Sequence, residues 1–353
     1  MAERVLMKGN EAIAEAAIRA GCRHYFGYPI TPQTEIAAYM AKKMPKIGGV
    51  FLQAESEIAS INMVYGAAAA GMRVMTSSSS PGISLKAEGL SYLAGSDIPA
   101  LVVNVQRGGP GLGGIQPSQS DYFQATKGGG HGDYRMIVLA PASVQEMASL
   151  TMKGFDLADK YCMTSMILAD GTIGQMMEPI TFEDTEVKTY EKPWALTGTE
   201  KKRPHNIINS LYLKPDELEK KNFERYEKYA EIEKNEAMWE NYMMDDAEIC
   251  VVAFGIASRV AKNAVVAARK EGIKVGLIRP ITLWPFPNAA FEATENVKAF
   301  VSVELSMGQM IEDVRLATQC KKPVSLCNRC GGMITSPDEI LEAIRNAEKG
   351  VNG

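Results

Sequence analysis

The chain has 353 residues, of which 46% are hydrophobic and 23% are charged, and its net charge at pH 7 is −4. Its composition is ordinary for a globular protein, and its length allows two domains with a linker. No cluster of basic residues favours nucleic-acid binding, and no apolar run approaches the roughly 18 residues that would span a bilayer. The N-terminal segment lacks the apolar core of a secretory signal, so we expect a cytoplasmic protein.

Residues 1–180 alternate short apolar strands with amphipathic helices. Strands are expected at Val5–Met7, His24–Tyr28, Gly49–Gln53, Val74–Thr76, Ala100–Val105, Met136–Ala140 and Met163–Ala169. Helices are expected to begin at Asn10, Thr31-Pro32, Ser56, Ile83 and Val144. Proline suits a first helical turn, where its missing N–H group is not needed. This alternation is typical of a parallel sheet with helices on both faces.

Residues 181–246 are rich in charge, and 215–241 read as one long polar helix. Its sparse apolar side chains are Leu218, Phe223, Tyr226, Tyr229 and Ile232. A solvated connecting helix is one interpretation. The other is that the aromatic stripe binds a partner subunit.

Residues 247–353 resume the alternation and predict a second, smaller α/β domain. Strands are expected at Ile249–Ala253, Val275–Arg279, Ala299–Val303 and Pro323–Cys327, and helices at Ala257–Lys270, Gln309–Thr318 and Pro337–Ala347. The fold class is therefore α/β with two parallel-sheet domains.

The six cysteines include one C-x-x-C pair, Cys327 and Cys330. A zinc or iron–sulfur site needs about four ligands, and no second pair lies nearby. We expect no metal on this chain and a structural role for the pair, while redox and intersubunit roles stay open.

The glycine run Gly108–Gly114 follows a strand, but its spacing is not that of a dinucleotide-binding loop. The run Thr76–Gly82 could present N–H groups and hydroxyls to an anion, or could form a capped strand-to-helix turn. The three histidines build no recognisable triad or zinc motif. Acid–base chemistry therefore falls to carboxylates or a cofactor.

Glu57 is the most informative carboxylate. It follows the predicted strand Gly49–Gln53 and lies in the first turn of the next helix. This edge of an open parallel sheet is where ligands bind. A carboxylate there also favours the helix dipole, so its position alone leaves a structural role open.

Several motifs together resemble the α subunit of the 2-oxoacid:ferredoxin oxidoreductases, the pyruvate–ferredoxin oxidoreductase family. They are Phe26–Pro32, Glu55–Ala59, Gly66–Gly71, Thr76–Gly82, Val105–Gly108, Val251–Gly255 and Val275–Pro287. The resemblance implies a pyrimidine-binding thiamine-diphosphate domain at 1–180, a charged helical linker at 181–246 and a transketolase-C-terminal-like domain at 247–353.

The resemblance also implies roles for single residues. Thr31 would hydrogen-bond the 2-oxoacid, and Arg107 would pair with its carboxylate. Glu57 would bond N1′ of the cofactor's aminopyrimidine. The remaining cofactor contacts would be Tyr28, Pro29, Ile30 and Ser80, although Ser80 stands where many relatives have glycine.

The G-D-G motif that holds Mg²⁺ and diphosphate in thiamine enzymes is absent from this sequence. In divided members of the family it belongs to a separate β subunit. The resemblance therefore implies thiamine diphosphate shared with that subunit, and 4Fe–4S clusters on partners that include γ and ferredoxin-like δ subunits. The reaction would be oxidative decarboxylation of a 2-oxoacid in anaerobic metabolism, with the acyl group passing to coenzyme A and electrons to ferredoxin.

The run Gly113–Tyr122 is most similar to the branched-chain, or 3-methyl-2-oxobutanoate (2-ketoisovalerate), type. The 2-oxoglutarate type stays open, because a few apolar contacts separate such substrates by only about 1–3 kcal/mol. Two alternatives differ in class: a non-catalytic assembly subunit that retains the fold, and a self-sufficient thiamine decarboxylase or transketolase. The number of partner subunits and the physiological direction are also left open.

Overall fold

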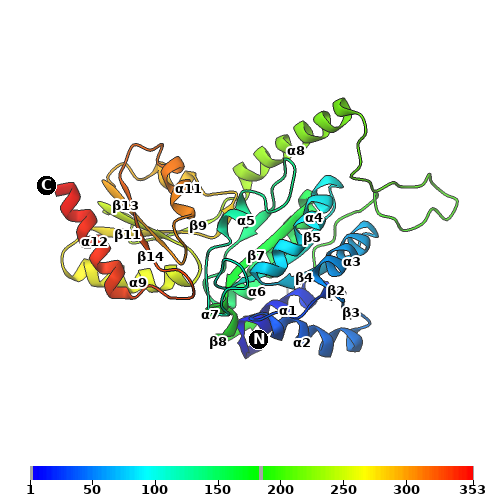
Figure 1. The fold of residues 1–353 in the computed structure, drawn as a ribbon, viewed down its shortest axis with the longest axis horizontal. Coiled ribbons are helices and arrows are strands. Elements are labelled where there is room, and N and C mark those ends of the chain that lie inside the picture. Colours follow the sequence, from blue (N-terminus) through cyan, green and yellow to red (C-terminus); the bar gives the residue numbers. More distant parts are fainter. Residues whose placement is uncertain (1–2, 183–185, 353) are drawn as a thin grey trace.

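The computed structural model describes residues 3–182 and 186–352. In Figure 1 a larger α/β region lies on the right, a smaller one on the left, and the long helix α8 (Pro215–Asn235) above. No helix within those two ranges is long and apolar enough to cross a membrane.

The larger sheet has the strand order β12-β6-β7-β5-β4-β2-β3 within the described residues. Its strands are β2 (His24–Gly27), β3 (Val50–Gln53), β4 (Val74–Ser78), β5 (Ala100–Gln106), β6 (Ile137–Leu139), β7 (Thr164–Asp170) and β12 (Thr282–Trp284). Strands β2 to β7 run parallel, which confirms the predicted sheet. The edge strand β12 was not predicted; it comes from the C-terminal part of the chain and pairs antiparallel with β6.

Helices cover both faces of this sheet. They are α1 (Gly9–Arg19), α2 (Thr34–Lys43), α3 (Glu57–Ala69), α4 (Ser80–Gly95) and α6 (Val144–Tyr161), with short helices α5 (Tyr122–Thr126), η1 (Met44–Ile47) and α7 (Gly171–Gln175). Because crossovers between parallel strands are right-handed, α3 and α4 lie on the face opposite α2 and α6. Helix α3 packs on α4, and α1 packs on α2 and α6.

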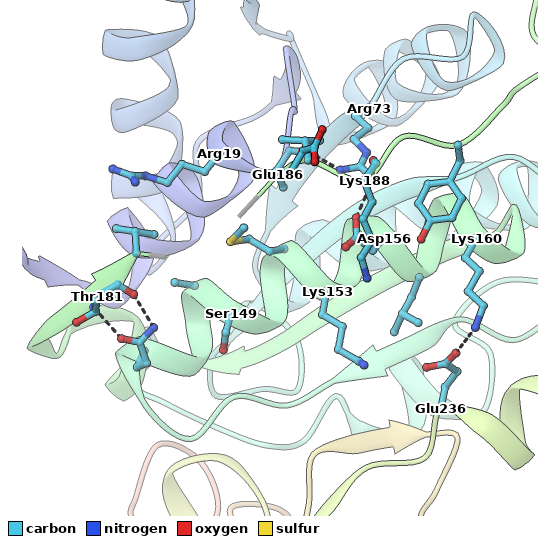
Figure 2. Close-up of a pocket in the computed structure, with 18 residues that line it drawn as sticks. Arg19, Arg73, Ser149, Lys153, Asp156, Lys160, Thr181, Glu186, Lys188 and Glu236 are labelled. Atoms are coloured by element: carbon cyan, nitrogen blue, oxygen red, sulfur yellow. Dashed lines mark hydrogen bonds and ion pairs between the residues drawn. The ribbon is translucent and has the colours of Figure 1, made fainter. Parts of the chain in front are cut away.

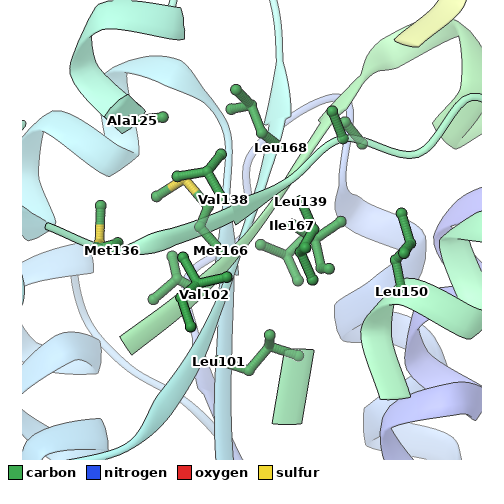
Figure 3. Close-up of a cluster of buried hydrophobic side chains, with 14 of the residues drawn as sticks. Leu101, Val102, Ala125, Met136, Val138, Leu139, Leu150, Met166, Ile167 and Leu168 are labelled. Carbon is green, nitrogen blue, oxygen red and sulfur yellow. The ribbon is translucent and has the colours of Figure 1, made fainter. Parts of the chain in front are cut away.

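The central strands carry the core of this region (Figure 3). Leu101, Val102, Val138, Met166 and Ile167 are fully buried between the two helical layers. Strands that are buried on both faces need near-continuous apolar sequence rather than alternation. The apolar runs in the sequence therefore located β5, β6 and β7 correctly.

The strand predicted at Val5–Met7 is present as β1 (Glu3–Lys8), but its expected place in the parallel sheet is wrong. It pairs antiparallel with β8 (Met177–Phe182) in a separate two-stranded sheet. Helix α1 follows β1 directly and packs on α6. The helix therefore covers the main sheet although the strand before it lies outside that sheet.

The smaller sheet has the order β14-β13-β10-β11-β9. Its strands are β9 (Trp239–Tyr242), β10 (Ile249–Ala253), β11 (Val275–Pro280), β13 (Ala299–Glu304) and β14 (Val324–Asn328), and its helices are α9 (Gly255–Lys270), α10 (Ala289–Glu292), α11 (Met310–Ala317) and α12 (Pro337–Asn352). The expected helix over 215–241 is wrong in its last turn, because β9 leaves the helical path to pair antiparallel with β11. Helix α8 buries Tyr229 and Ile232 and exposes Phe223, so it is not solvated all round.

The two regions meet at the carboxyl edge of the larger sheet. The Gln119 side chain donates to the Phe254 carbonyl at 2.8 Å and accepts from the Leu305 N–H at 3.1 Å. Asp170, at the end of β7, accepts from the Ile256 N–H at 3.1 Å. The smaller region therefore packs beside the edge at which the predicted site residues lie.

Candidate functional site

The candidate site occupies the carboxyl ends of β2, β3, β4 and β5. Parallel strands bring these ends to one edge, where open α/β sheets bind ligands. Thr31 and Arg107 lie in the loops that follow β2 and β5, and Glu57 and Ser80 are the first residues of α3 and α4. All four predicted residues therefore lie at the same edge of the sheet.

Arg107 joins two of these loops. Its Nη1 donates to the Thr31 carbonyl at 3.1 Å and its Nη2 to the Leu112 carbonyl at 3.1 Å. The side chain is only 7% exposed, and its Nε has no partner among the described residues. A buried guanidinium with an unused N–H can still bind a carboxylate, and Thr31 is exposed beside it.

Ser80 connects Arg107 to a buried polar network that the sequence did not predict. The Arg107 N–H donates to Ser80 Oγ at 3.0 Å, and Ser80 Oγ donates to Asp121 at 2.6 Å. Asn104 Nδ2 also donates to Asp121, at 2.9 Å. Burial raises the pKa of Asp121, although these hydrogen bonds offset part of that effect. One feature of the sequence could have revealed this network: Asn104 is a polar residue within an otherwise apolar strand.

Glu57 is the first residue of α3 and is 6% exposed. Ser56, where this helix was expected to begin, caps it by accepting from the Ala59 N–H at 3.1 Å. A Cβ atom on Gly82 would lie 2.7 Å from Glu57 Oε1 and 2.1 Å from Ser78 Oγ. The carboxylate and this hydroxyl therefore lie together against a glycine that leaves them room.

The polar groups beside Glu57 fit a heterocyclic ligand. The hydroxyls of Ser78 and Ser79 are buried without a hydrogen-bond partner among the described residues. The Glu57 side chain also accepts no hydrogen bond within residues 3–182 and 186–352. Buried polar atoms normally have partners. A ring with both donor and acceptor atoms, such as an aminopyrimidine, would supply them.

The expected helix start at Thr31-Pro32 is wrong, because α2 begins only at Thr34. Residues 28–33 instead turn back on themselves: the Gln33 N–H donates to the Ile30 carbonyl at 3.1 Å, and its side chain donates to the Tyr28 carbonyl at 3.3 Å. This turn keeps Tyr28, Pro29 and Ile30 at the sheet edge, where the cofactor contacts were expected. Their contact with a cofactor stays a prediction.

A cavity of about 580 Å³ opens beside this turn. Its lining includes Thr31, Ile115 and Gln116 from the larger region and Ile334 from the smaller one. Gly108 lies close to the Gly331 backbone, since a Cβ on Gly108 would be 3.2 Å from the Gly331 carbonyl carbon. Both regions therefore contribute to the surroundings of Thr31.

A second cavity, of about 730 Å³, lies along α6, away from these residues (Figure 2). Its charged lining is largely paired: Arg73 binds Asp156 at 2.9 Å, and Lys160 binds Glu236 at 2.7 Å. None of the predicted site residues lines it.

The described residues contain no group of three or more His, Cys, Asp or Glu side chains that could hold a metal ion. Cys327 is buried in β14, and Cys330 is exposed in the loop that follows. Burial raises the pKa of the Cys327 thiol to about 11. Burial therefore disfavours the thiolate, which is the nucleophilic form of a cysteine.

Both parts of the chain match known families. Residues 15–245 match the family described as "Pyruvate flavodoxin/ferredoxin oxidoreductase, thiamine diP-bdg". Residues 247–340 match "Pyruvate:ferredoxin oxidoreductase core domain II". These two matches together describe a thiamine-diphosphate-binding oxidoreductase.

Two relatives cover nearly the whole chain. Ketoisovalerate oxidoreductase subunit VorB of Methanothermobacter thermautotrophicus is 54% identical over 342 residues, or 96% of this chain and 97% of the relative. 2-Oxoglutarate synthase subunit KorA of Methanocaldococcus jannaschii is 37% identical over 382 residues, or 96% of this chain and 98% of the relative. The chain belongs to the thiamine-diphosphate-dependent 2-oxoacid:ferredoxin oxidoreductases, a family of enzymes that act with partner subunits.

Solved structures agree with this assignment. The 2-oxoglutarate:ferredoxin oxidoreductase from Magnetococcus marinus, solved with 2-oxoglutarate, coenzyme A and succinyl-CoA bound, matches with a TM-score of 0.88 and 31% identity. The match covers 98% of this chain and 65% of that one, so this chain spans slightly less than two thirds of its length. A split-gene transketolase, described as an inactive beta4 tetramer, shares the fold with a TM-score of 0.63 at 13% identity, covering 97% and 98% of the two chains. The predicted family and fold class are confirmed.

Proposed function

We propose that this chain holds the pyrimidine end of thiamine diphosphate in a CoA-acylating oxidoreductase for a branched-chain 2-oxoacid of the 3-methyl-2-oxobutanoate type. The observation that carries the proposal is the contact of Arg107 with Thr31 at the sheet edge that also holds Glu57. The name of the VorB relative supports the substrate class. The apolar side chain of Ile115, which lines the cavity beside Thr31, supports it too.

The residues divide the work as follows. Thiamine diphosphate, when bound, supplies the nucleophilic carbon and the electron sink. Glu57 binds the aminopyrimidine N1′ and holds a shared proton there. Arg107 binds the substrate carboxylate and Thr31 hydrogen-bonds the substrate near its keto carbon. Ser80 and residues 28–30 contact the cofactor.

The rest of the reaction belongs to partner subunits. A β subunit supplies Mg²⁺ and the diphosphate site. The 4Fe–4S clusters are bound by partner subunits, which include γ and a ferredoxin-like δ subunit. Electrons pass to ferredoxin and the acyl group passes to coenzyme A. The absence of a G-D-G motif from this sequence supports this division.

The proposed domains are 1–180 for the pyrimidine site, 181–246 for the linker and 247–353 for the transketolase-C-terminal-like domain. The junction between the two family matches, at residues 245–247, supports the second boundary.

Reconstitution tests this function. The purified chain should show no 2-oxoacid-dependent viologen reduction alone, and should show it with β, γ and δ subunits. In a panel of 2-oxoacids, kcat/KM for 3-methyl-2-oxobutanoate should exceed that for 2-oxoglutarate by about tenfold or more. A higher kcat/KM for 2-oxoglutarate would instead show that the chain belongs to an enzyme of the 2-oxoglutarate type. No turnover of any 2-oxoacid would favour an assembly role, and Mg²⁺-dependent thiamine-diphosphate binding by the isolated chain would favour a self-sufficient enzyme.

A further inference from the structure

Residues 206–213, the arm segment, present an apolar surface on one side only. Along this segment the even-numbered residues are partly buried against the fold and the odd-numbered residues are exposed. The exposed side chains include Ile207, Leu211 and Leu213, which are 83%, 66% and 83% exposed. An alternation of period two is that of an extended, strand-like chain. In Figure 1 the segment leads up to the start of α8 at the margin of the fold.

The inner side of the arm segment is anchored to the larger region. Ile208 packs against the main hydrophobic core. Ser210 lies against the end of α4, since a Cβ on Gly95 would be 3.0 Å from Ser210 Cβ. The Asn206 side chain donates to the Ala195 carbonyl at 2.9 Å. These contacts hold the apolar side of the segment outward in one orientation.

The main chain of the arm segment is unpaired along one edge. Within residues 3–182 and 186–352, no N–H or carbonyl of 205–213 bonds another main-chain group. The Asn209 side chain occupies one edge, where it accepts from the Leu211 N–H at 2.8 Å and donates to the Leu211 carbonyl at 2.7 Å. In an extended chain the main-chain groups of Ile208, Ser210 and Tyr212 point to the opposite edge. An unpaired edge beside apolar side chains is a template for a second extended chain.

The charges that flank the arm segment indicate which chain that is. Three basic residues precede it and three acidic residues follow it: Lys201, Lys202 and Arg203, and then Asp216, Glu217 and Glu219. The ion pairs that these residues make within the chain, Lys202–Glu200 at 2.7 Å and Lys214–Glu217 at 2.8 Å, are exposed and contribute little. When two identical segments pair antiparallel, the basic flank of each lies beside the acidic flank of the other. The flanks are therefore complementary to a second copy of this chain.

We propose that the arm segment is a self-association surface on which two copies of this chain pair antiparallel about a two-fold axis near Ser210. The N–H and carbonyl groups of Ile208 in each copy bond those of Tyr212 in the other. On the outer side, Ile207 of each copy packs beside Leu213 of the other. A two-fold interface of this kind uses the same patch on both copies.

This surface leaves the candidate functional site accessible. The arm segment contacts α4 at Gly95, its last residue, whereas Ser80 is its first. The helix has 16 residues, so its two ends lie about 22 Å apart. Two copies can therefore pair through their arm segments while the sheet edge of each stays open to a β subunit.

Sedimentation velocity of the purified full chain tests the pairing. The wild type should be a dimer at micromolar concentration. The double variant Leu211→Asp/Leu213→Asp should raise the Kd of the dimer by about 100-fold or more, because it buries unpaired carboxylates. Leu316→Asp is the matched control, since Leu316 lies on α11 and is 67% exposed, and it should leave the dimer intact. A monomeric wild type, or a double variant that dimerises like the wild type, would overturn the proposal.

A charge exchange tests the antiparallel orientation. Lys201→Glu/Lys202→Glu places acidic residues on both flanks, and Asp216→Lys/Glu219→Lys places basic residues on both. Each variant alone should dimerise about tenfold more weakly than the wild type, because like charges then meet. An equal mixture of the two should regain wild-type affinity as a heterodimer. A mixture no tighter than its components would show that the flanks do not meet in this way, and the proposal would fail.

Addition of the β subunit separates a second copy from the other candidate occupant. The resulting complex should contain two copies of this chain, and the double variant Leu211→Asp/Leu213→Asp should bind the β subunit as the wild type does. If the β subunit instead splits the dimer, and the double variant binds it more weakly, the arm segment is part of the contact with the β subunit and the proposal is wrong. Thermal unfolding of each variant shows that it is folded.

Discussion

Gly82→Ala should separate the geometry of Glu57 from the stability of the fold. Gly82 lies in the first turn of α4 with an ordinary helical backbone, so alanine is allowed there. Its Cβ, however, would come within 2.1 Å of Ser78 Oγ and 2.7 Å of Glu57 Oε1. Both atoms must move away.

The size of the effect follows from these distances. Ordinary Cβ contacts are 3.4–4 Å, so the Glu57 carboxylate must retreat by about 1 Å. A misplacement of about 1 Å in a catalytic group costs about 100-fold in rate, and we expect that loss in kcat/KM. Overpacking costs about 1–3 kcal/mol, but alanine regains up to about 1 kcal/mol of helix propensity. The melting temperature should therefore fall by only a few degrees.

The assay is 2-oxoacid-dependent viologen reduction by the reconstituted complex, alongside thermal unfolding of each variant. Gly66→Ala is the matched control: Gly66 lies in α3, as Glu57 does, and a Cβ there would meet nothing within 4 Å. It should keep full activity and gain slightly in stability. A folded Gly82→Ala enzyme that retains activity within threefold of wild type would refute this account of the Glu57 site.

Three other predictions follow from single contacts. Arg107→Lys loses the planar fork that binds a carboxylate, and steady-state kinetics should show kcat/KM for the 2-oxoacid lowered by about 100-fold; an unchanged value would show that Arg107 does not bind substrate. Asp170→Asn cannot accept the N–H bonds of Thr172, Ile173 and Ile256 together, and denaturant unfolding should show a loss of about 1–3 kcal/mol; full stability would contradict the role of Asp170 at the junction. Burial lowers the pKa of Lys86 from 10.5 to about 8 on folding. Between these two values the unfolded chain binds more protons than the folded chain, so the free energy of unfolding should rise from pH 8 to 10.5, by up to about 3 kcal/mol. Denaturant titrations of wild type and Lys86→Met should show this rise only in the wild type; equal slopes would contradict it.

Local sequence patterns predicted much of the fold because they depend on near neighbours. The apolar runs of β5 and β7 are long enough to show burial on both faces. The start of α3 was predicted at Ser56, one residue before its observed first residue, Glu57. The same reasoning placed Glu57 at the ligand edge, although its proposed chemical role came from the family resemblance.

Sequence patterns did not predict the strands whose formation depends on pairing with a distant segment. Strands β8, β9 and β12 are short and form because β1, β11 and β6 accept them as antiparallel neighbours. Nothing within a run of three to six residues specifies such a pairing. The turn at 28–33 replaced an expected helix start for a similar reason, because bonds within the loop and to its surroundings compete with helix formation.

The environment of Glu57 shows the same division. The sequence by itself determined that a carboxylate lies in the first turn of a helix that follows a strand, because the alternation of strands and helices is a local pattern. Only the tertiary structure decided that Lys86 is buried against the first turn of α3, that Ser78 and Gly82 lie beside the Glu57 carboxylate, and that Arg107 reaches the Thr31 loop. Those contacts join separate loops and helices, and the packing of α3 on α4 and of neighbouring strands brings them together.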